Sequence, residues 1–186
     1  MRFHTSRTLF AAGLFTVSAF AHAGGFTLAS ATIKPNSTLT EAQVFNGFGC
    51  NGKNISPALK WSGAPAGTKS FAVTVYDPDA PTGSGWWHWV VFNIPASATE
   101  LPEGAGAANG TGLPAGAVQG RTDFGAPGFG GACPPQGDKP HRYIFTVYAL
   151  KTDKIDVPGN ATSAMVGYNL NANKLATARI TGLYGR

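Results

Sequence analysis

Charged side chains are scarce in this chain. Only 12% of its 186 residues are Asp, Glu, Lys or Arg, about half the usual ~25% of soluble globular proteins. Such a low charge content excludes a coiled coil and an acidic disordered tail. Long apolar runs are missing as well, since none reaches the ~18 residues that a membrane-spanning helix needs. This second absence excludes a polytopic membrane protein.

Several signatures of catalysis and cofactor binding are missing too. The sequence contains no G-x-S-x-G, H-E-x-x-H or C-x-x-C pattern, so none of these motifs marks an activated nucleophile or a metal site. The spacing G-x-G-x-x-G occurs at residues 47–52, but no clear strand precedes it and Pro57 follows where a helix is needed. Dinucleotide binding is therefore excluded, and we expect no cofactor, no metal and no catalytic residue.

Glycine, by contrast, is abundant. The chain has 25 Gly and 13 Pro, and its glycine content stands well above the usual ~7%. Because the length also fits one domain that is large enough to bury a core, the composition predicts a loop-rich globular protein.

The N-terminus has the pattern of a cleavable signal peptide. A basic start leads into a short apolar run over residues 9–21, and the small residues Ala21 and Ala23 suit a signal peptidase. We expect residues 1–23 to be removed and residues 24–186 to form a single periplasmic or secreted domain. The alternative, a permanent membrane anchor, is disfavoured because the apolar run is too short.

Removal of this segment weakens the case for a nucleic-acid partner. The formal net charge falls from +5 to +3, because two arginines and no acidic residues leave with the peptide. The remaining lysines stand mostly alone, without a basic run or a nucleic-acid motif. We therefore predict no nucleic-acid binding.

The chain has two cysteines, Cys50 and Cys133. In an oxidising compartment two lone cysteines are expected to pair rather than to bind metal. A bond across so long a loop would stabilise the fold by about 4 kcal/mol in the chain-entropy account. Two buried free thiols are the alternative.

Short apolar and β-branched runs predict a mostly β protein. The runs at 87–94 and 143–150 are apolar on both faces, which indicates central strands that are covered on each side. A helix is expected to open near Thr162. Its residues at helical spacing are Met165, Tyr168, Asn169, Ala172 and Ala176. The other expected strands cover residues 26–33, 70–76, 118–122 and 179–184. Many strands with one or two late helices favour a two-sheet architecture.

Both histidines of the mature chain, His88 and His141, stand at the start of an apolar strand beside a Gly- or Pro-rich loop. Asp77 follows another strand, in a stiff turn that Pro78 and the next proline restrict. We expect Asp77 to orient a histidine, whereas Asp79 could simply cap its turn. A purely structural role for both histidines is the alternative.

The glycine-rich loop at residues 128–135 is a third candidate element. Backbone of this kind can aim several N–H groups at one point and so form a small anion-binding nest. Glycine clusters also serve as plain tight turns, so the loop on its own is a weak signal.

Together these segments resemble the phosphatidylethanolamine-binding protein family, and within it the bacterial Raf-kinase-inhibitor-like branch. The resemblance runs in order along the whole mature chain. Its motifs are Asp77-Pro78-Asp79-Ala80-Pro81, Trp86-Trp87-His88-Trp89, Cys133-Pro134-Pro135 and Pro140-His141-Arg142-Tyr143. It implies a large central antiparallel β-sheet, a second smaller sheet and C-terminal helices. It also implies a pocket for small anions such as phosphate, acetate or a phospholipid head group.

Carried over by position, the implied ligand-binding residues are Asp77, His88, His141 and Tyr143, with Trp86 nearby and the loop from Gly131 to Pro135 as a wall. The family's eukaryotic members have Gly-Pro-Pro in that wall, where this chain has Ala132-Cys133-Pro134-Pro135. The resemblance gives no reason to expect the eukaryotic kinase partners.

We predict an exported, non-enzymatic protein that binds a small anion or a phosphate-bearing head group, with a regulatory or inhibitory role as one option. One alternative is a metal- or acid–base-assisted hydrolase that uses His88, His141 and Asp77. Another is a protease inhibitor or host-interaction protein in which the pocket is vestigial. The sequence names no protein partner.

Overall fold

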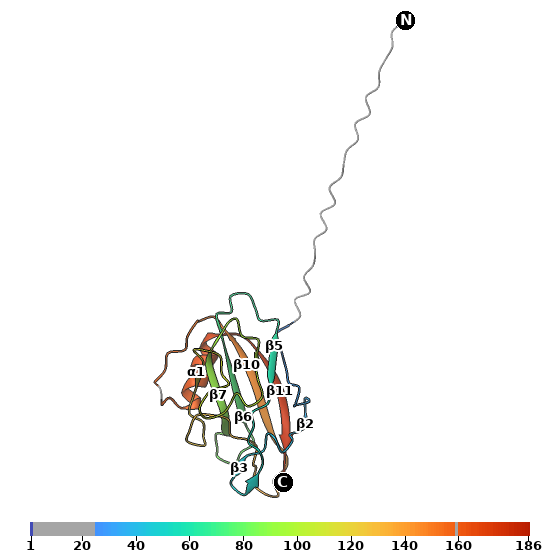
Figure 1. Ribbon diagram of the computed structural model, residues 1–186, viewed down its shortest axis with the longest axis vertical. Coiled ribbons are helices and arrows are strands. Elements are labelled where there is room, and N and C mark those ends of the chain that lie inside the picture. Colours follow the sequence, from blue (N-terminus) through green and yellow to red (C-terminus); the bar gives the residue numbers. More distant parts are fainter. Residues whose placement is uncertain (2–24, 159) are drawn as a thin grey trace.

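The computed structural model describes residue 1, residues 25–158 and residues 160–186. All of the expected signal peptide except Met1 lies outside these residues. Strands dominate the described chain, and one helix comes late, as the composition and pattern predict (Figure 1). The elements are β1 (Thr27–Ala29), β2 (Ser37–Thr38), β3 (Asn46–Gly47), β4 (Cys50–Asn51), β5 (Leu59–Ser62), β6 (Ser70–Asp77), β7 (Trp86–Pro95), β8 (Glu100–Leu101), β9 (Val118–Gln119), β10 (His141–Leu150), α1 (Ser163–Asn173) and β11 (Lys174–Tyr184).

The framework is a six-stranded sheet with the order β2-β11-β10-β6-β7-β9. Its pairs are antiparallel except for the short parallel pair of β2 with β11. The middle strands β10, β6 and β7 are buried along nearly their whole length. This confirms the expectation for β7 and β10, whose runs are apolar on both faces. Strand β6 was expected as a strand with Phe71, Val73 and Val75 on one face, and it is buried on both faces.

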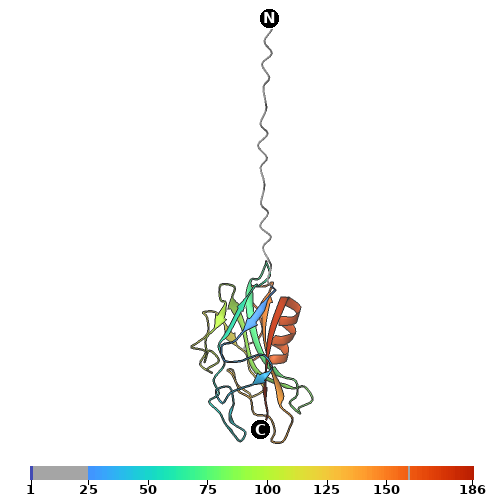
Figure 2. The same cartoon turned by 90° about the vertical axis from the view of Figure 1, so that its right-hand side faces the viewer.

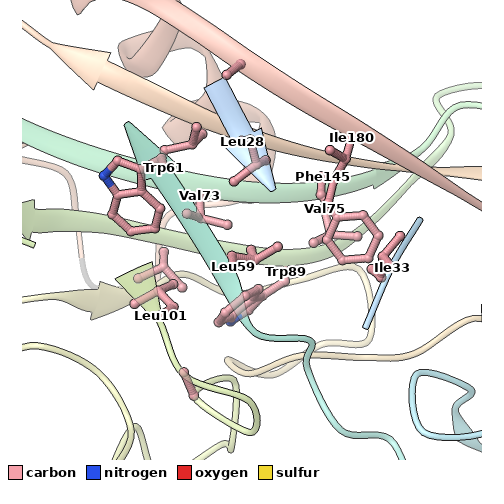
Figure 3. Close-up of a cluster of buried hydrophobic side chains, with 14 of the residues drawn as sticks. Leu28, Ile33, Leu59, Trp61, Val73, Val75, Trp89, Leu101, Phe145 and Ile180 are labelled. Carbon is pink, nitrogen blue, oxygen red and sulfur yellow. The ribbon is translucent and has the colours of Figure 1, made fainter. Parts of the chain in front are cut away.

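A second, three-stranded sheet with the order β1-β5-β8 covers one face of the large sheet. Side chains at alternate positions of β6 and β7 point into this layer, as the period of two along a strand requires. There Val73, Val75 and Trp89 meet Leu59 and Trp61 of the small sheet (Figure 3). The resulting core connects the strand ends that carry the candidate site.

Helix α1 covers the opposite face (Figure 2). Val166 and Leu170 are fully buried there against Val90 and Leu150 of the sheet. Thr162 caps the helix by accepting a hydrogen bond from the N–H of Met165. The large sheet therefore separates two apolar clusters.

The expected helical stripe is wrong in detail. Met165 and Tyr168 are 47% and 76% exposed, whereas the neighbouring positions Val166 and Leu170 are buried. The helix ends at Asn173, so Ala176 belongs to β11, which begins five residues before the expected start at Arg179. Met165 and Tyr168 suggested the wrong face of the helix. The face that packs on the sheet takes its large apolar side chains from Val166 and Leu170 alone.

Two of the other expected strands are shorter than predicted. The run over 26–33 keeps only three strand residues, because the hydroxyl of Ser30 accepts hydrogen bonds from the N–H groups of Thr32 and Ile33 and turns the chain. The run over 118–122 keeps only Val118 and Gln119. Strands of two to four residues such as β2, β3, β4, β5 and β8 have no pattern long enough to be recognised in the sequence.

We expect Leu170→Ala to lower the free energy of unfolding by about 2–4 kcal/mol, since it empties a fully buried site. Tyr168→Ala on the exposed face of the same helix is the matched control, with an expected change within about 0.5 kcal/mol. Urea denaturation of both variants measures the difference. Equal losses in the two variants would contradict the assignment of the buried face.

Candidate functional site

The candidate site forms where adjacent strands of the large sheet end. Asp77 is the last residue of β6, and His141 and Tyr143 lie at the start of the neighbouring strand β10. Because β6 and β10 are antiparallel with Tyr76 opposite Ile144, Asp77 comes beside Tyr143. The Nδ1 atom of His141 lies 2.8 Å from Oδ2 of Asp77, and both side chains are almost completely buried. The predicted carboxylate–histidine pair is thus present in the structure.

A β-bulge brings His88 to the same face of the sheet. Val75 pairs with Trp89 and Tyr76 pairs with Trp87, so His88 is an extra residue without a partner on β6. Regular alternation would place His88 on the helix-covered face, and a bulge changes the direction of the side chain. The His88 ring packs edge-on against Tyr143, with 5.1 Å between the ring centroids.

These residues line a pocket of about 150 Å³. Asp77, His88, His141 and Tyr143 supply the polar groups at its floor, whereas most of the remaining lining is apolar. The other lining residues are Phe48, Ala80, Pro81, Thr82, Trp86, Phe124, Cys133, Pro134 and Pro135. The pocket therefore fits a small polar group with an apolar neighbourhood.

Both oxygens of Asp77 are engaged by the protein. Oδ1 accepts hydrogen bonds from the N–H groups of Asp79 and Ala80, and Oδ2 accepts one from His141. This carboxylate therefore fixes the turn and orients the histidine, and it has no donor for an anion. Asp79, for which a capping role was considered, instead accepts two hydrogen bonds from the Arg142 guanidinium and one from the Arg142 N–H.

Asp138 is a site residue that sequence reasoning missed. Its Oδ2 lies 3.3 Å from Nε2 of His141, so both ring nitrogens of His141 face carboxylates. A turn places it, since the N–H of Asp138 bonds to the C=O of Pro135 and that of Gly137 to the C=O of Arg186. The only sequence signal is an acid three residues before the histidine, which is too common to be informative.

The two remaining polar groups have uncommon environments. Nδ1 of His88 lies 2.7 Å from the C=O of Gly130, which can only accept, so Nδ1 carries the hydrogen. Burial lowers the pKa of His88, and this effect outweighs the opposing influence of Gly130 and of the Asp77 carboxylate. The imidazole is accordingly neutral near pH 7, with a lone pair on Nε2.

The Tyr143 hydroxyl is buried without a hydrogen-bond partner among the described residues. The backbone N–H of Cys133 lies near its oxygen but outside hydrogen-bonding geometry. Burial raises the pKa of Tyr143 well above its usual range, so the hydroxyl keeps its hydrogen. An unpartnered buried hydroxyl costs about 1–3 kcal/mol, and this one belongs to a residue that lines the pocket.

The expected anion nest is wrong. Within the glycine-rich loop, the N–H of Gly130 bonds to the C=O of His88, that of Gly131 to Oδ1 of Asn54, and that of Ala132 to the C=O of Gln43. These three N–H groups are therefore bonded within the protein and are not available to a ligand. Gly131 does not line the pocket, whereas Pro135 does.

Two links hold the pocket wall against the hairpin of β3 and β4. The predicted disulfide is confirmed, since Cys50 on β4 is bonded to Cys133 in the wall. Arg186 adds hydrogen bonds from its guanidinium to the carbonyls of Pro134, Gly49 and Phe48. As a result Phe48, which is 67% exposed and has a φ of 53°, is held at the pocket rim.

Comparisons with known proteins agree with this architecture. The family model described as phosphatidylethanolamine-binding protein matches residues 29–185. The chain belongs to this family. The UPF0098 protein YbcL of Escherichia coli is 65% identical over 173 residues, which span 91% of this chain and 94% of YbcL. The UPF0098 protein YbhB of the same organism is 54% identical over 157 residues, which span 84% of this chain and 98% of YbhB.

Solved structures of the family confirm the fold. The crystal structure of E. coli YbcL matches with a TM-score of 0.86 and covers 88% of this chain and 99% of its own. A family homologue from Chlamydia trachomatis, 30% identical, matches with a TM-score of 0.72 and covers 87% of this chain and 98% of its own. The resemblance to the bacterial branch of the family is thereby confirmed.

In residues 25–158 and 160–186, no group of three or more His, Cys, Asp or Glu side chains is arranged to hold a metal ion. Over the same part of the chain, no helix has the length and apolar character to cross a membrane.

We expect the Asp79–Arg142 ion pair to make stability depend on pH at the acid end. Hydrogen bonds from Arg142 lower the pKa of Asp79 from 3.8 to about 2. Because the folded state lowers this pKa, the contribution is complete above about pH 4 and is lost as the pH falls toward 2. Asp79→Asn should therefore be less stable at pH 7, and its stability should fall less steeply over that acid range.

Urea denaturation at a series of pH values measures this slope. Asp153→Asn is the control, because Asp153 is 81% exposed and its contact with Lys69, at 4.0 Å, is long, so this pair should contribute little to stability. A slope for Asp79→Asn equal to that of the wild type would contradict the role of the pair.

We also expect the double variant Cys50→Ser, Cys133→Ser to lose about 2–4 kcal/mol of unfolding free energy. The bond joins two residues that are 83 positions apart, so it closes a long loop of the unfolded chain. Guanidinium denaturation measures the loss, with the reduced wild type as a second comparison. If the variant and the oxidised wild type unfold at the same denaturant concentration, the bond contributes nothing to stability.

Proposed function

We propose that this chain is an exported, non-enzymatic binding protein whose pocket takes a small anion, in particular a phosphate or a phosphate-bearing head group. One observation carries the proposal. The buried Tyr143 hydroxyl has no hydrogen-bond partner in the part of the chain that the structure describes, although it lines a pocket together with His88 and His141. Buried hydroxyls are nearly always paired, so an unpaired one at a pocket floor favours a ligand that pairs with it.

Export is part of the proposal. The signal-peptide pattern of residues 1–23 supports it, and so does the Cys50–Cys133 disulfide, which an oxidising compartment would form and maintain. We place the mature protein, residues 24–186, in the periplasm or the extracellular space. There the pocket would meet free anions and the head groups of phospholipids.

A binding role is favoured over hydrolysis because two of the pocket's reactive side chains, His141 and Thr82, are engaged within the protein. Both nitrogens of His141 face carboxylates, so this ring is not free to activate a nucleophile. The pocket's one aliphatic hydroxyl, on Thr82, donates its hydrogen to the C=O of Gly85. A screen for phosphoesterase and esterase turnover separates the two functions, and saturable turnover would refute the non-enzymatic assignment.

We expect Tyr143→Phe to weaken phosphate binding about three- to tenfold, because it removes one hydrogen bond of about 0.5–1.5 kcal/mol. The same change should not destabilise the free protein, since it also removes an unpaired buried polar atom. Calorimetric titration with inorganic phosphate and with phosphoethanolamine measures the affinity, and thermal unfolding measures the stability.

Tyr148→Phe is the matched control. Tyr148 lies on the same strand but packs in the helix-covered cluster on the other face of the sheet, so its affinity for phosphate should equal that of the wild type. Identical titration curves for Tyr143→Phe and the wild type would reject the proposed site. A pull-down from envelope extract with wild type and Tyr143→Phe tests the remaining alternative, an interaction protein that does not use its pocket.

A further inference from the structure

The pocket floor offers hydrogen-bond acceptors where a simple anion needs donors. His88 gives its Nδ1 hydrogen to the C=O of Gly130, and burial, which lowers the pKa of His88, favours the neutral ring, in which Nε2 is a lone pair. His141 has a carboxylate at each ring nitrogen, that of Asp77 on one side and that of Asp138 on the other. Neither histidine therefore has a free N–H for a ligand in this state.

The backbone supplies few donors in their place. Around the pocket, the N–H groups of Asp79 and Ala80 bond to Asp77, and those of Gly130 and Gly131 bond elsewhere in the protein. The wall residues Pro134 and Pro135 have no N–H at all. Among the side chains that line the pocket, the donors that remain are the Tyr143 hydroxyl and the indole N–H of Trp86, and the N–H of Cys133 lies near the Tyr143 oxygen.

We infer that the pocket selects oxyanions that carry a hydrogen of their own, such as hydrogen phosphate, over oxyanions that lack one, such as sulfate and phosphodiesters. The inference rests on the proposed function and narrows its ligand class. An oxyanion with an O–H donates that hydrogen to Nε2 of His88 and accepts one from Tyr143, so both groups are satisfied. An oxyanion without a hydrogen places its own lone pairs opposite the lone pair of Nε2. Two acceptors then face each other with no hydrogen between them, and Nε2 remains without a hydrogen bond.

An oxyanion without a hydrogen, such as sulfate, can pair with Nε2 of His88 only when His88 takes up a proton from solvent. Burial opposes this protonation, while the carbonyls of Gly130 and Gly131 and the nearby carboxylates of Asp77 and Asp123 favour it. Burial has the largest effect of these and lowers the pKa of His88. Binding of sulfate is therefore coupled to proton uptake, whereas binding of hydrogen phosphate near pH 8 is not.

Hydrogen phosphate and sulfate form a matched pair of ligands, because near pH 8 both are tetrahedral dianions and they differ by one hydrogen. We expect calorimetry on the mature wild type to give at least about tenfold tighter binding of phosphate, the size of effect that one unsatisfied buried partner produces. Titration in buffers with different ionisation enthalpies should show about one proton taken up per sulfate bound and none per phosphate.

A second pair of ligands distinguishes free phosphate from a phospholipid head group. Phosphoethanolamine is a monoester that carries a hydrogen near pH 6, whereas glycerophosphoethanolamine is a diester that has none. The monoester should bind more tightly than the diester at pH 6 and should lose most of this advantage at pH 8. Equal affinities at both pH values would favour a lipid head group and overturn the inference.

Variants test the atoms involved. His88→Gln provides an amide that can turn its NH₂ toward the ligand, so the preference for phosphate over sulfate should fall toward one. Tyr143→Phe is the control, because it removes a donor that both anions use and should leave the ratio of their affinities unchanged.

Asp138→Asn, at an exposed position, should raise sulfate affinity more than phosphate affinity. Asp156→Asn, beyond the far end of β10, controls for the loss of one negative charge.

The outcomes separate the two proposals. If sulfate binds as tightly as phosphate and takes up no proton, the inference is wrong and the anion site stands. If neither anion binds the wild type or Asp138→Asn at any pH between about 6 and 8, the proposed function fails and the inference fails with it.

Discussion

The buried hydrogen bond between Asp77 and His141 is the interaction on which the site depends. It joins the last residue of β6 to the first residue of β10. The same carboxylate holds the turn that follows β6. Removal of one partner leaves the other as a buried polar group without its hydrogen bond, at a cost of about 1–3 kcal/mol. The geometry of the pocket floor is thus tied to the integrity of the central sheet.

Much of this arrangement could be predicted from the sequence. Apolar runs identified two of the three central strands, β7 and β10, and predicted β6 as a strand. The strand patterns placed Asp77 and His141 at strand ends, and the family motif added Tyr143. The position of His88 was expected, but its direction was not, because a one-residue bulge depends on the pairing register and leaves no mark in a run of aromatic residues. For the same reason the short strands could not be identified from local pattern alone.

The errors share a physical cause. The glycine-rich loop was expected to present N–H groups to a ligand, yet its donors bond to residues 40 or more positions away, such as His88 and Asn54. Asp138 was missed because its role comes from a turn that the C-terminal Arg186 helps to hold. Hydrogen bonds between distant segments decide which polar groups remain free, and a sequence without its fold does not show them.

The rim of the pocket is mainly apolar, whereas its floor is polar, and this difference limits which ligands the pocket can bind. The rim consists of Phe48, Trp86, Phe124 and prolines, and a disulfide and Arg186 hold it in place. Apolar surface of this kind adds contact area but discriminates weakly between ligands. The floor has few polar atoms, and most of their hydrogens are held by partners inside the protein. For the oxyanion site proposed above, specificity lies in the hydrogens of the floor, so the chemistry of the ligand's oxygens matters more than the group that it carries.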